Sequence, residues 1–184
     1  EAEGNAIFST ANKLDLNFSK CIELIISCKG KIVISGIGKS GNIGRKITST
    51  LASLGTPSIF LHTSDAFHGD LGNLRKNDLL ILISNSGETD ELQKLLNYAK
   101  INGNKSIAIT GNINSNISKK ANYCLDASVE SEACTLNLAP TCSTSVTMAL
   151  GDALAIICAM ERGFKEIDFA RFHPSGNLHK SNFE

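Results

Sequence analysis

The sequence predicts an α/β protein with an open, parallel, five-stranded sheet and helices on both faces, a three-layer sandwich of the Rossmann or flavodoxin type. Short apolar runs such as Leu79–Ile83 have the length and composition of strands buried on both faces. Segments with apolar residues at helical spacing alternate with these runs, as is typical of parallel sheets. No internal repeat or low-complexity linker interrupts the alternation, so residues 1–184 are predicted to form a single domain.

The first half of the chain begins with a predicted long amphipathic helix. Apolar residues recur every three or four positions from Ile7 to Ile25, which predicts one helix that ends near Lys29, with Gly30 just past its C-terminus. We expect a loop with at most one helical turn over residues 63–71. Between these segments the pattern predicts a strand at 31–35, a helix at 42–54 and a strand at 58–61.

The second half continues the alternation of strands and helices. The strand at 79–83 is followed by a helix that ends near Ile101, and a second long helix is predicted from Thr141 to Gly163. The tail shows helical propensity only near residues 167–170. Between the two helices the pattern predicts a strand at 106–110, a short helix at 113–121 and a weak strand at 123–126.

A turn rich in hydroxyl groups follows the predicted strand 79–83. Ser84, Ser86 and Thr89 converge where this strand gives way to a helix, and the turn contains no Lys or Arg. In a parallel sheet this is the edge where ligands bind, and a helix N-terminus there favours anions. The turn therefore predicts a site for a phosphate monoester held by neutral donors. The alternative is a plain helix cap, with Ser86 or Thr89 at the N-cap.

The turn after the first strand, Gly36-Ile37-Gly38-Lys39-Ser40-Gly41, resembles two nucleotide-binding motifs without completing either. It matches G-x-G-x-x-G, but the second strand lacks the acidic residue at its end that would bind a ribose. The Walker pattern fails because Val33 stands where a glycine is required. Lys39 and Ser40 are expected at the same sheet edge as Ser84, although a turn lysine can also be a solvated surface residue.

Composition excludes several classes of function. The 18 basic and 18 acidic residues give zero net charge, so no nucleic-acid partner is expected. We expect no apolar run to approach the roughly 20 residues that cross a bilayer, so no membrane partner is predicted. Six scattered cysteines without a C-x-x-C pair predict reduced thiols and a cytoplasmic location. The spacing of His, Cys and carboxylate residues predicts no metal site.

Three further residues are candidates for chemistry. Glu132 follows the last predicted strand and is therefore expected at the carboxyl edge of the sheet, although loop acids are commonly only surface residues. His68 lies in the loop after the second strand. His173 lies in a turn near the chain end, where a histidine is more often an exposed bystander.

Together, these residues and motifs resemble the sugar isomerase (SIS) domain of the D-arabinose 5-phosphate isomerases over essentially the whole chain. The resemblance implies interconversion of D-ribulose 5-phosphate and D-arabinose 5-phosphate, which supplies 3-deoxy-D-manno-octulosonate (Kdo) synthesis for lipopolysaccharide or capsule. It also implies a cytoplasmic homotetramer with sites built between subunits. The matching segments, in order, are residues 36–41, 56–57, 68–72, 84–88, 132–134, 138–141, 151–154, 162–164, 168–170 and 173–174.

Carried over position by position, the resemblance implies two sets of site residues. It implies a phosphate cradle of Ser40, Ser84, Ser86 and Thr89, with His68 at the same pocket, and a catalytic set of Lys39, Glu91, Glu132 and His173. The residue that matches His173 reaches a neighbouring subunit's site in the family. Many relatives carry a C-terminal pair of CBS domains that this chain lacks, which predicts a single-domain form. Ser175 stands in the tail turn where relatives usually have glycine.

The expected chemistry is proton transfer through a cis-enediol, without a metal or redox cofactor. We expect Glu132 to act as the base, with a pKa raised by burial, and His173 as the acid, although the two roles could be exchanged. Lys39 would stabilise developing negative charge, and Glu91 would orient hydroxyl groups or Lys39.

Three other interpretations stay open at this point: a non-catalytic phosphosugar-binding regulatory module, an isomerase of another ketose phosphate, and a nucleotide-binding Rossmann protein. CMP-Kdo, the pathway's CMP-linked product, is a candidate feedback inhibitor at the open sheet edge.

Overall fold

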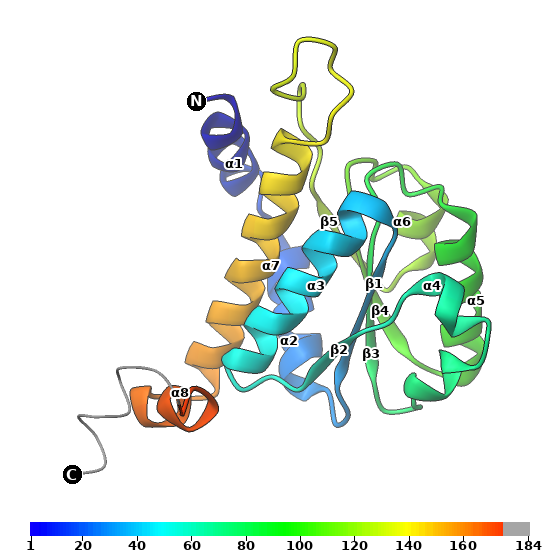
Figure 1. Ribbon diagram of the computed structural model, residues 1–184, viewed down its shortest axis with the longest axis vertical. Helices are drawn as coiled ribbons and strands as arrows, with labels where there is room; N and C mark the ends of the chain where they lie inside the picture. The colour runs from blue at the N-terminus through cyan, green and yellow to red at the C-terminus, as the bar shows by residue number, and fades with distance from the viewer. Residues whose placement is uncertain (175–184) are drawn as a thin grey trace.

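A computed structural model of the chain describes residues 1–174 and contains the predicted five-stranded, all-parallel sheet (Figure 1). The strand order is β2-β1-β3-β4-β5. The strand β2 is added on one side of β1, and β3, β4 and β5 are added on the other side, so the order of the strands reverses between β1 and β3. Ligands of open α/β sheets bind outside the carboxyl ends of the strands at such a reversal. The strands are β1 (Ile32–Gly36), β2 (Ser58–Phe60), β3 (Leu79–Ile83), β4 (Lys105–Thr110) and β5 (Tyr123–Asp126).

Helices cover both faces of the sheet and form the predicted three layers (Figure 1). Alternate strand residues point to opposite faces, so Ile32 and Ile34 pack with α2, α3 and α7, whereas Val33 packs with α4, α5 and α6. The helices are α1 (Ala2–Asn12), α2 (Leu16–Ser27), α3 (Gly38–Ser53), α4 (Thr63–Ala66), η1 (Asp70–Asn73, a 3-10 turn), α5 (Asp90–Asn102), α6 (Asn116–Lys120), α7 (Cys142–Glu161) and α8 (Glu166–Phe172).

The prediction of one long N-terminal helix is wrong, because the segment forms two helices that meet at residues 13–15. Asp15 begins α2, and its carboxylate accepts a hydrogen bond from the backbone N–H of Asn17 at 2.8 Å. An aspartate at this position competes with helix continuation by capping a new helix. Gly30 does not cap α2, which ends at Ser27 with Cys28 as its C-cap residue. Instead, Gly30 packs against the Asp78 carboxylate, where a Cβ would lie 2.2 Å from Oδ1.

The α3 helix begins at Gly38, four residues before the predicted start, so Lys39 and Ser40 belong to its first turn rather than to a loop. Close packing explains the early start, since a Cβ on Gly41 would lie 2.7 Å from the carbonyl oxygen of Gly36. The loop expected over residues 63–71 contains α4 and the start of η1. The difference noted at Ser175 lies outside the described residues.

The α7 helix is the long C-terminal helix of the prediction, and it packs along α3. A Cβ on Gly151 would lie 2.3 Å from Cδ1 of Ile47, so the two helices pack there without room for a side chain at Gly151. Contrary to the sequence argument, this 20-residue helix is long and apolar enough to cross a bilayer by length and composition. Its most apolar window is 56% buried within the fold, as in a core helix.

An ion pair between the buried Asp78 and the partly buried Lys31 joins the amino ends of β1 and β3. Asp78 accepts hydrogen bonds from Nζ of Lys31 at 2.6 Å, from the backbone N–H of Lys31 at 2.9 Å and from the backbone N–H of Arg75 at 2.8 Å. Burial alone would raise the pKa of Asp78, but these hydrogen bonds hold it below its ordinary value.

We expect Asp78→Ala to lower the free energy of unfolding by about 3 kcal/mol, since it leaves Lys31 and two backbone N–H groups without their acceptor. The wild-type contribution should be complete above the ordinary pKa of aspartate and should be lost as pH falls through the lower folded value. Urea unfolding at several pH values measures both effects. Glu23→Ala, which breaks the exposed pair with Lys20, should change stability by less than about 1 kcal/mol. Equal losses in the two variants would contradict the interpretation.

Candidate active site

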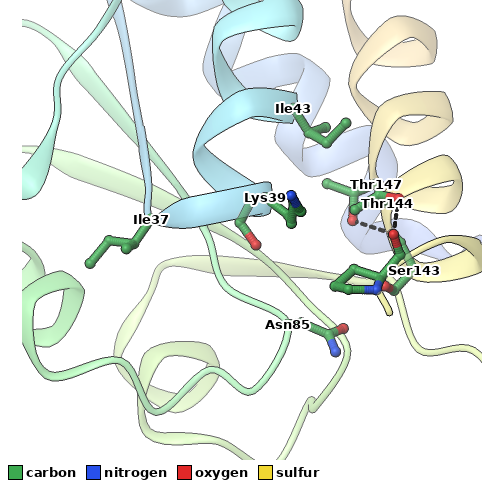
Figure 2. A pocket seen from close by; sticks show the side chains of 9 residues that line it. Ile37, Lys39, Ile43, Asn85, Ser143, Thr144 and Thr147 are labelled. Carbon is green, nitrogen blue, oxygen red and sulfur yellow. Dashed lines mark hydrogen bonds between the residues drawn. The ribbon is translucent and has the colours of Figure 1, made fainter. Parts of the chain in front are cut away.

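A cavity of about 230 Å³ lies at the carboxyl edge of the sheet, between α3, α7 and the loop after β3 (Figure 2). Lys39 and Ser40 enter it from the first turn of α3, and Asn85 enters it from the loop after β3. Figure 2 shows Lys39 facing the hydroxyl groups on the first turns of α7. The lining residues are Ile37, Lys39, Ser40, Ile43, Asn85, Pro140, Ser143, Thr144 and Thr147.

The loop after β3 brings two of its three hydroxyl groups, those of Ser84 and Thr89, into contact, whereas Ser86 is exposed. Ser84 Oγ lies 2.9 Å from Thr89 Oγ1 and also accepts a hydrogen bond from the backbone N–H of Gly87 at 3.1 Å. Ser86 Oγ accepts a hydrogen bond from the backbone N–H of Glu88 at 3.2 Å. Thr89 occupies the N-cap of α5 but makes no side-chain capping bond, so the alternative of a plain cap by Thr89 is wrong.

The same loop is anchored to the neighbouring β4–α6 connection. Backbone N–H groups of Gly111 and Ile117 donate to the carbonyl oxygens of Asn85 and Gly87, at 3.0 and 3.1 Å. The Glu88 carboxylate accepts hydrogen bonds from the side chain and backbone of Asn116, and these lower the pKa of Glu88. The loop that carries the candidate phosphate cradle is therefore held on both sides by hydrogen bonds within the protein.

Glu132 lies beside the cavity and caps α7. Its carboxylate accepts hydrogen bonds from the backbone N–H of Thr141 at 2.8 Å, from Thr141 Oγ1 at 3.0 Å, from the backbone N–H of Ser143 at 3.2 Å and from Ser143 Oγ. The expectation of a raised pKa is wrong. Burial acts in that direction, but the hydrogen bonds from Ser143 and Thr141 outweigh it and lower the pKa of Glu132.

The remaining candidate residues do not line this cavity. Glu91 is exposed on the first turn of α5, and His68 is exposed between α4 and η1. His173 follows α8, which lies at the C-terminal end of α7 (Figure 1), whereas Glu132 binds the N-terminal end of α7. Its ring stacks on Phe169 with centroids 3.9 Å apart. Because α7 is about 30 Å long, one chain does not bring His173 together with Lys39.

Sequence reasoning missed the α7 wall of the cavity and Asn85. Ser143 and Thr147 are four residues apart and share one helix face, with Thr144 beside them. The signal was present as an unusual run of hydroxyl residues at the start of an apolar helix, from Thr141 to Thr147. Nothing in that run alone indicates which face points toward Lys39.

The residues described by the structure offer no group of three or more His, Cys, Asp or Glu side chains that could hold a metal ion. All six cysteines are free thiols. The polar groups at the cavity include a lysine ammonium group, several hydroxyl groups and a nearby carboxylate.

The chain belongs to the SIS domain family, since the family model "SIS domain" matches residues 25–157. Two curated relatives are arabinose 5-phosphate isomerases. KpsF of Escherichia coli is 51% identical over 177 residues, 96% of this chain and 56% of that protein. KdsD of Pseudomonas aeruginosa is 49% identical over 176 residues, 96% of this chain and 54% of that protein. The chain thus spans about half the length of these relatives.

Solved structures agree with this family. The E. coli CFT073 protein c3406, solved in complex with arabinose 5-phosphate, superimposes with a TM-score of 0.91 at 41% identity, covering 94% of this chain and 92% of that chain. NanR of Vibrio vulnificus, complexed with ManNAc-6P, superimposes with a TM-score of 0.81 at 19% identity, covering 94% of this chain and 65% of that chain. The second likeness shows the shared fold alone.

We expect Gly87→Ala to destabilise the protein by about 2 kcal/mol, because Gly87 has φ +67° and a Cβ would lie 2.0 Å from Ser115 Oγ. Gly103→Ala is the matched control. Gly103 also has positive φ, at +85°, but its added Cβ would meet nothing closer than 3.9 Å. Urea unfolding should show a smaller loss for Gly103→Ala, about 1 kcal/mol. Equal losses would mean that the loop has room to shift.

Proposed function

We propose that the protein is an aldose–ketose isomerase that interconverts D-ribulose 5-phosphate and D-arabinose 5-phosphate. The observation that carries the proposal is the placement of Lys39 opposite α7, with the Glu132 carboxylate bound at the N-terminus of that helix. The identity to arabinose 5-phosphate isomerases over 96% of the chain supports this substrate class. The product would supply Kdo synthesis for lipopolysaccharide or capsule.

In this proposal the loop after β3 binds the phosphate group. Ser84, Ser86 and Thr89 are neutral donors, and Ser40 and the N-terminus of α5 lie at the same sheet edge. Neutral donors and a helix N-terminus together suit a phosphate monoester. The His68 side chain is exposed and free to approach a bound sugar at that edge.

The proposed reaction moves one proton between adjacent carbons and one between adjacent oxygens. Glu132 removes the proton from C1 of the ketose while an acid protonates O2, giving the cis-enediol. O1 then loses its proton, C2 receives one, and the aldose forms without net oxidation. Lys39 stabilises the negative charge that develops on the oxygens, and Glu91 orients Lys39 or substrate hydroxyl groups.

His173 supplies the acid in this proposal, from a neighbouring subunit of a cytoplasmic homotetramer. Its distance from Lys39 within one chain supports a contribution across an interface. Exposed apolar side chains on α1 and α7, including Phe8 at 73% and Met160 at 71%, support burial of these helices by further copies. Six free thiols agree with a reducing compartment.

Proton NMR of the protein with D-ribulose 5-phosphate in deuterated water tests the activity. Wild-type protein should generate arabinose 5-phosphate signals, with deuterium entering at C2. Glu132→Gln should lower turnover by about 10²–10⁴-fold, since a positioned base supplies that much. The control is Glu130→Gln, which changes an exposed carboxylate two residues away and should turn over normally. A loss under tenfold in Glu132→Gln would remove Glu132 as the base.

The same assay separates the proposal from its main competitor. A non-catalytic phosphosugar-binding module is the second candidate, because the hydroxyl-rich loop after β3 suits a phosphate group whether or not a reaction follows. A sensor would show a phosphosugar-induced rise in Tm without turnover. Turnover of a different ketose phosphate would instead keep the enzyme class and change the substrate.

Mixing two inactive variants tests whether sites are shared between subunits. Lys39→Met and His173→Ala should each lose activity alone. After subunit exchange, roughly a quarter of the sites should combine a native Lys39 with a native His173 from another chain and recover turnover. If both residues act within one chain, no mixture contains a native site. Absence of recovery, with exchange verified by mass spectrometry, would contradict the shared site.

A further inference from the structure

The N-terminus of α7 is capped by a residue distant in sequence. Thr141 occupies the N-cap position, with φ −132° and ψ −74°, but makes no side-chain capping bond of its own. The acceptor is instead the carboxylate of Glu132, nine residues earlier in the chain. Two backbone N–H groups and two hydroxyl groups, all from Thr141 and Ser143, donate to this one carboxylate. We call these two residues the hydroxyl clamp.

We propose that the hydroxyl clamp, Thr141 and Ser143, positions the Glu132 carboxylate for proton transfer beside the cavity. The inference rests on the proposed isomerase function and adds two residues to its machinery. Neither clamp residue reacts with substrate in this proposal, so both are positioning residues. Ser143 also lines the cavity, opposite Lys39, so the clamp joins the loop that carries Glu132 to the wall of the site.

Geometry argues that the clamp does more than terminate a helix. A single Ser, Thr, Asp or Asn at the N-cap satisfies the ordinary need of a helix start. Here the Ser143 side chain is only 4% exposed, and its hydroxyl is directed to Glu132. Thr141 Oγ1 accepts a hydrogen bond from the backbone N–H of Ala133 at 2.8 Å and donates one to the Glu132 carboxylate. One hydroxyl group therefore holds both the backbone next to Glu132 and its side chain.

The clamp also fits the chemistry of an isomerase. Its donors favour the carboxylate over the carboxylic acid, in line with the lowered pKa of Glu132. A base of this kind is ionised at neutral pH and readily gives up a captured proton. Isomerisation needs this behaviour, because the proton taken from one carbon must be returned to the next. Other titratable groups also face this region: Glu130 and Cys134 of the same loop, Glu3 of α1 and Lys39 of α3. Within the described residues, none of these four groups donates a hydrogen bond to the Glu132 carboxylate.

The first test measures the clamp without relying on activity. The titration midpoint of the Glu132 carboxyl carbon is followed by carbon-13 NMR, with the signal assigned by its loss in Glu132→Gln. Ser143→Ala should raise this midpoint, because the ionised form loses a donor. The control is Ser145→Ala on the same helix turn, whose hydroxyl donates to Glu3 at 2.7 Å, and it should leave the midpoint unchanged. An unchanged midpoint in Ser143→Ala overturns the proposal, whether or not the protein is an isomerase.

The second test measures catalysis. Ser143→Ala and Thr141→Val should each lower kcat by about tenfold or more with little change in KM, because the carboxylate of the base is then no longer held in one position beside the substrate. The acidic limb of the pH profile should move upward in both variants. Thr141→Ser keeps the hydroxyl and should retain most activity, and Ser145→Ala should match the wild type. If Ser143→Ala keeps the wild-type kcat, the positioning role is overturned. If the wild-type protein is inactive but Ser143→Ala still shifts the titration midpoint of Glu132, only the isomerase function is rejected.

Discussion

The candidate site depends on how closely α3 packs against the sheet and against α7. A side chain at Gly41 would collide with the Gly36 carbonyl, and one at Gly151 would collide with Ile47. The first contact sets the start of α3 over the end of β1, where Lys39 leaves the helix. The second contact sets α7 beside it, so that Ser143 and Thr147 face Lys39. Both walls of the cavity therefore depend on the absence of a Cβ at a few positions.

Carboxylates at helix N-termini organise the loops around this cavity. Glu88 binds the first turn of α6, and Glu132 binds the first turn of α7. In each case a negative side chain satisfies backbone N–H groups that the helix itself leaves unpaired. The two loops are thereby ordered at the carboxyl edge of the sheet. The N-terminus of α5 keeps an N-cap residue, Thr89, whose hydroxyl binds Ser84 rather than its own helix.

Local sequence signals predicted the sheet more reliably than the helices. The strand at 79–83 occurs with the predicted bounds, because a strand buried among other strands leaves an apolar run between polar turns. The strand at 123–126, at the edge of the sheet, also has the predicted bounds. The predicted helix over residues 7–29 failed because its apolar periodicity continues across Asp15, which begins a second helix. Periodicity reports which side of a segment is buried, and it does not report a change of direction between two helices that are buried on similar sides.

The sequence by itself determined the fold class, the hydroxyl-rich loop after β3 and the position of Lys39 and Glu132 at one edge of the sheet. These follow from local patterns, since parallel strands all end at the same edge. The tertiary structure alone decided that Glu132 caps α7 and has a lowered pKa, that Ser143 lines the cavity and that His173 lies far from Lys39 in its own chain. These properties depend on contacts between residues distant in sequence, and the pKa of a carboxylate is set by the donors that surround it.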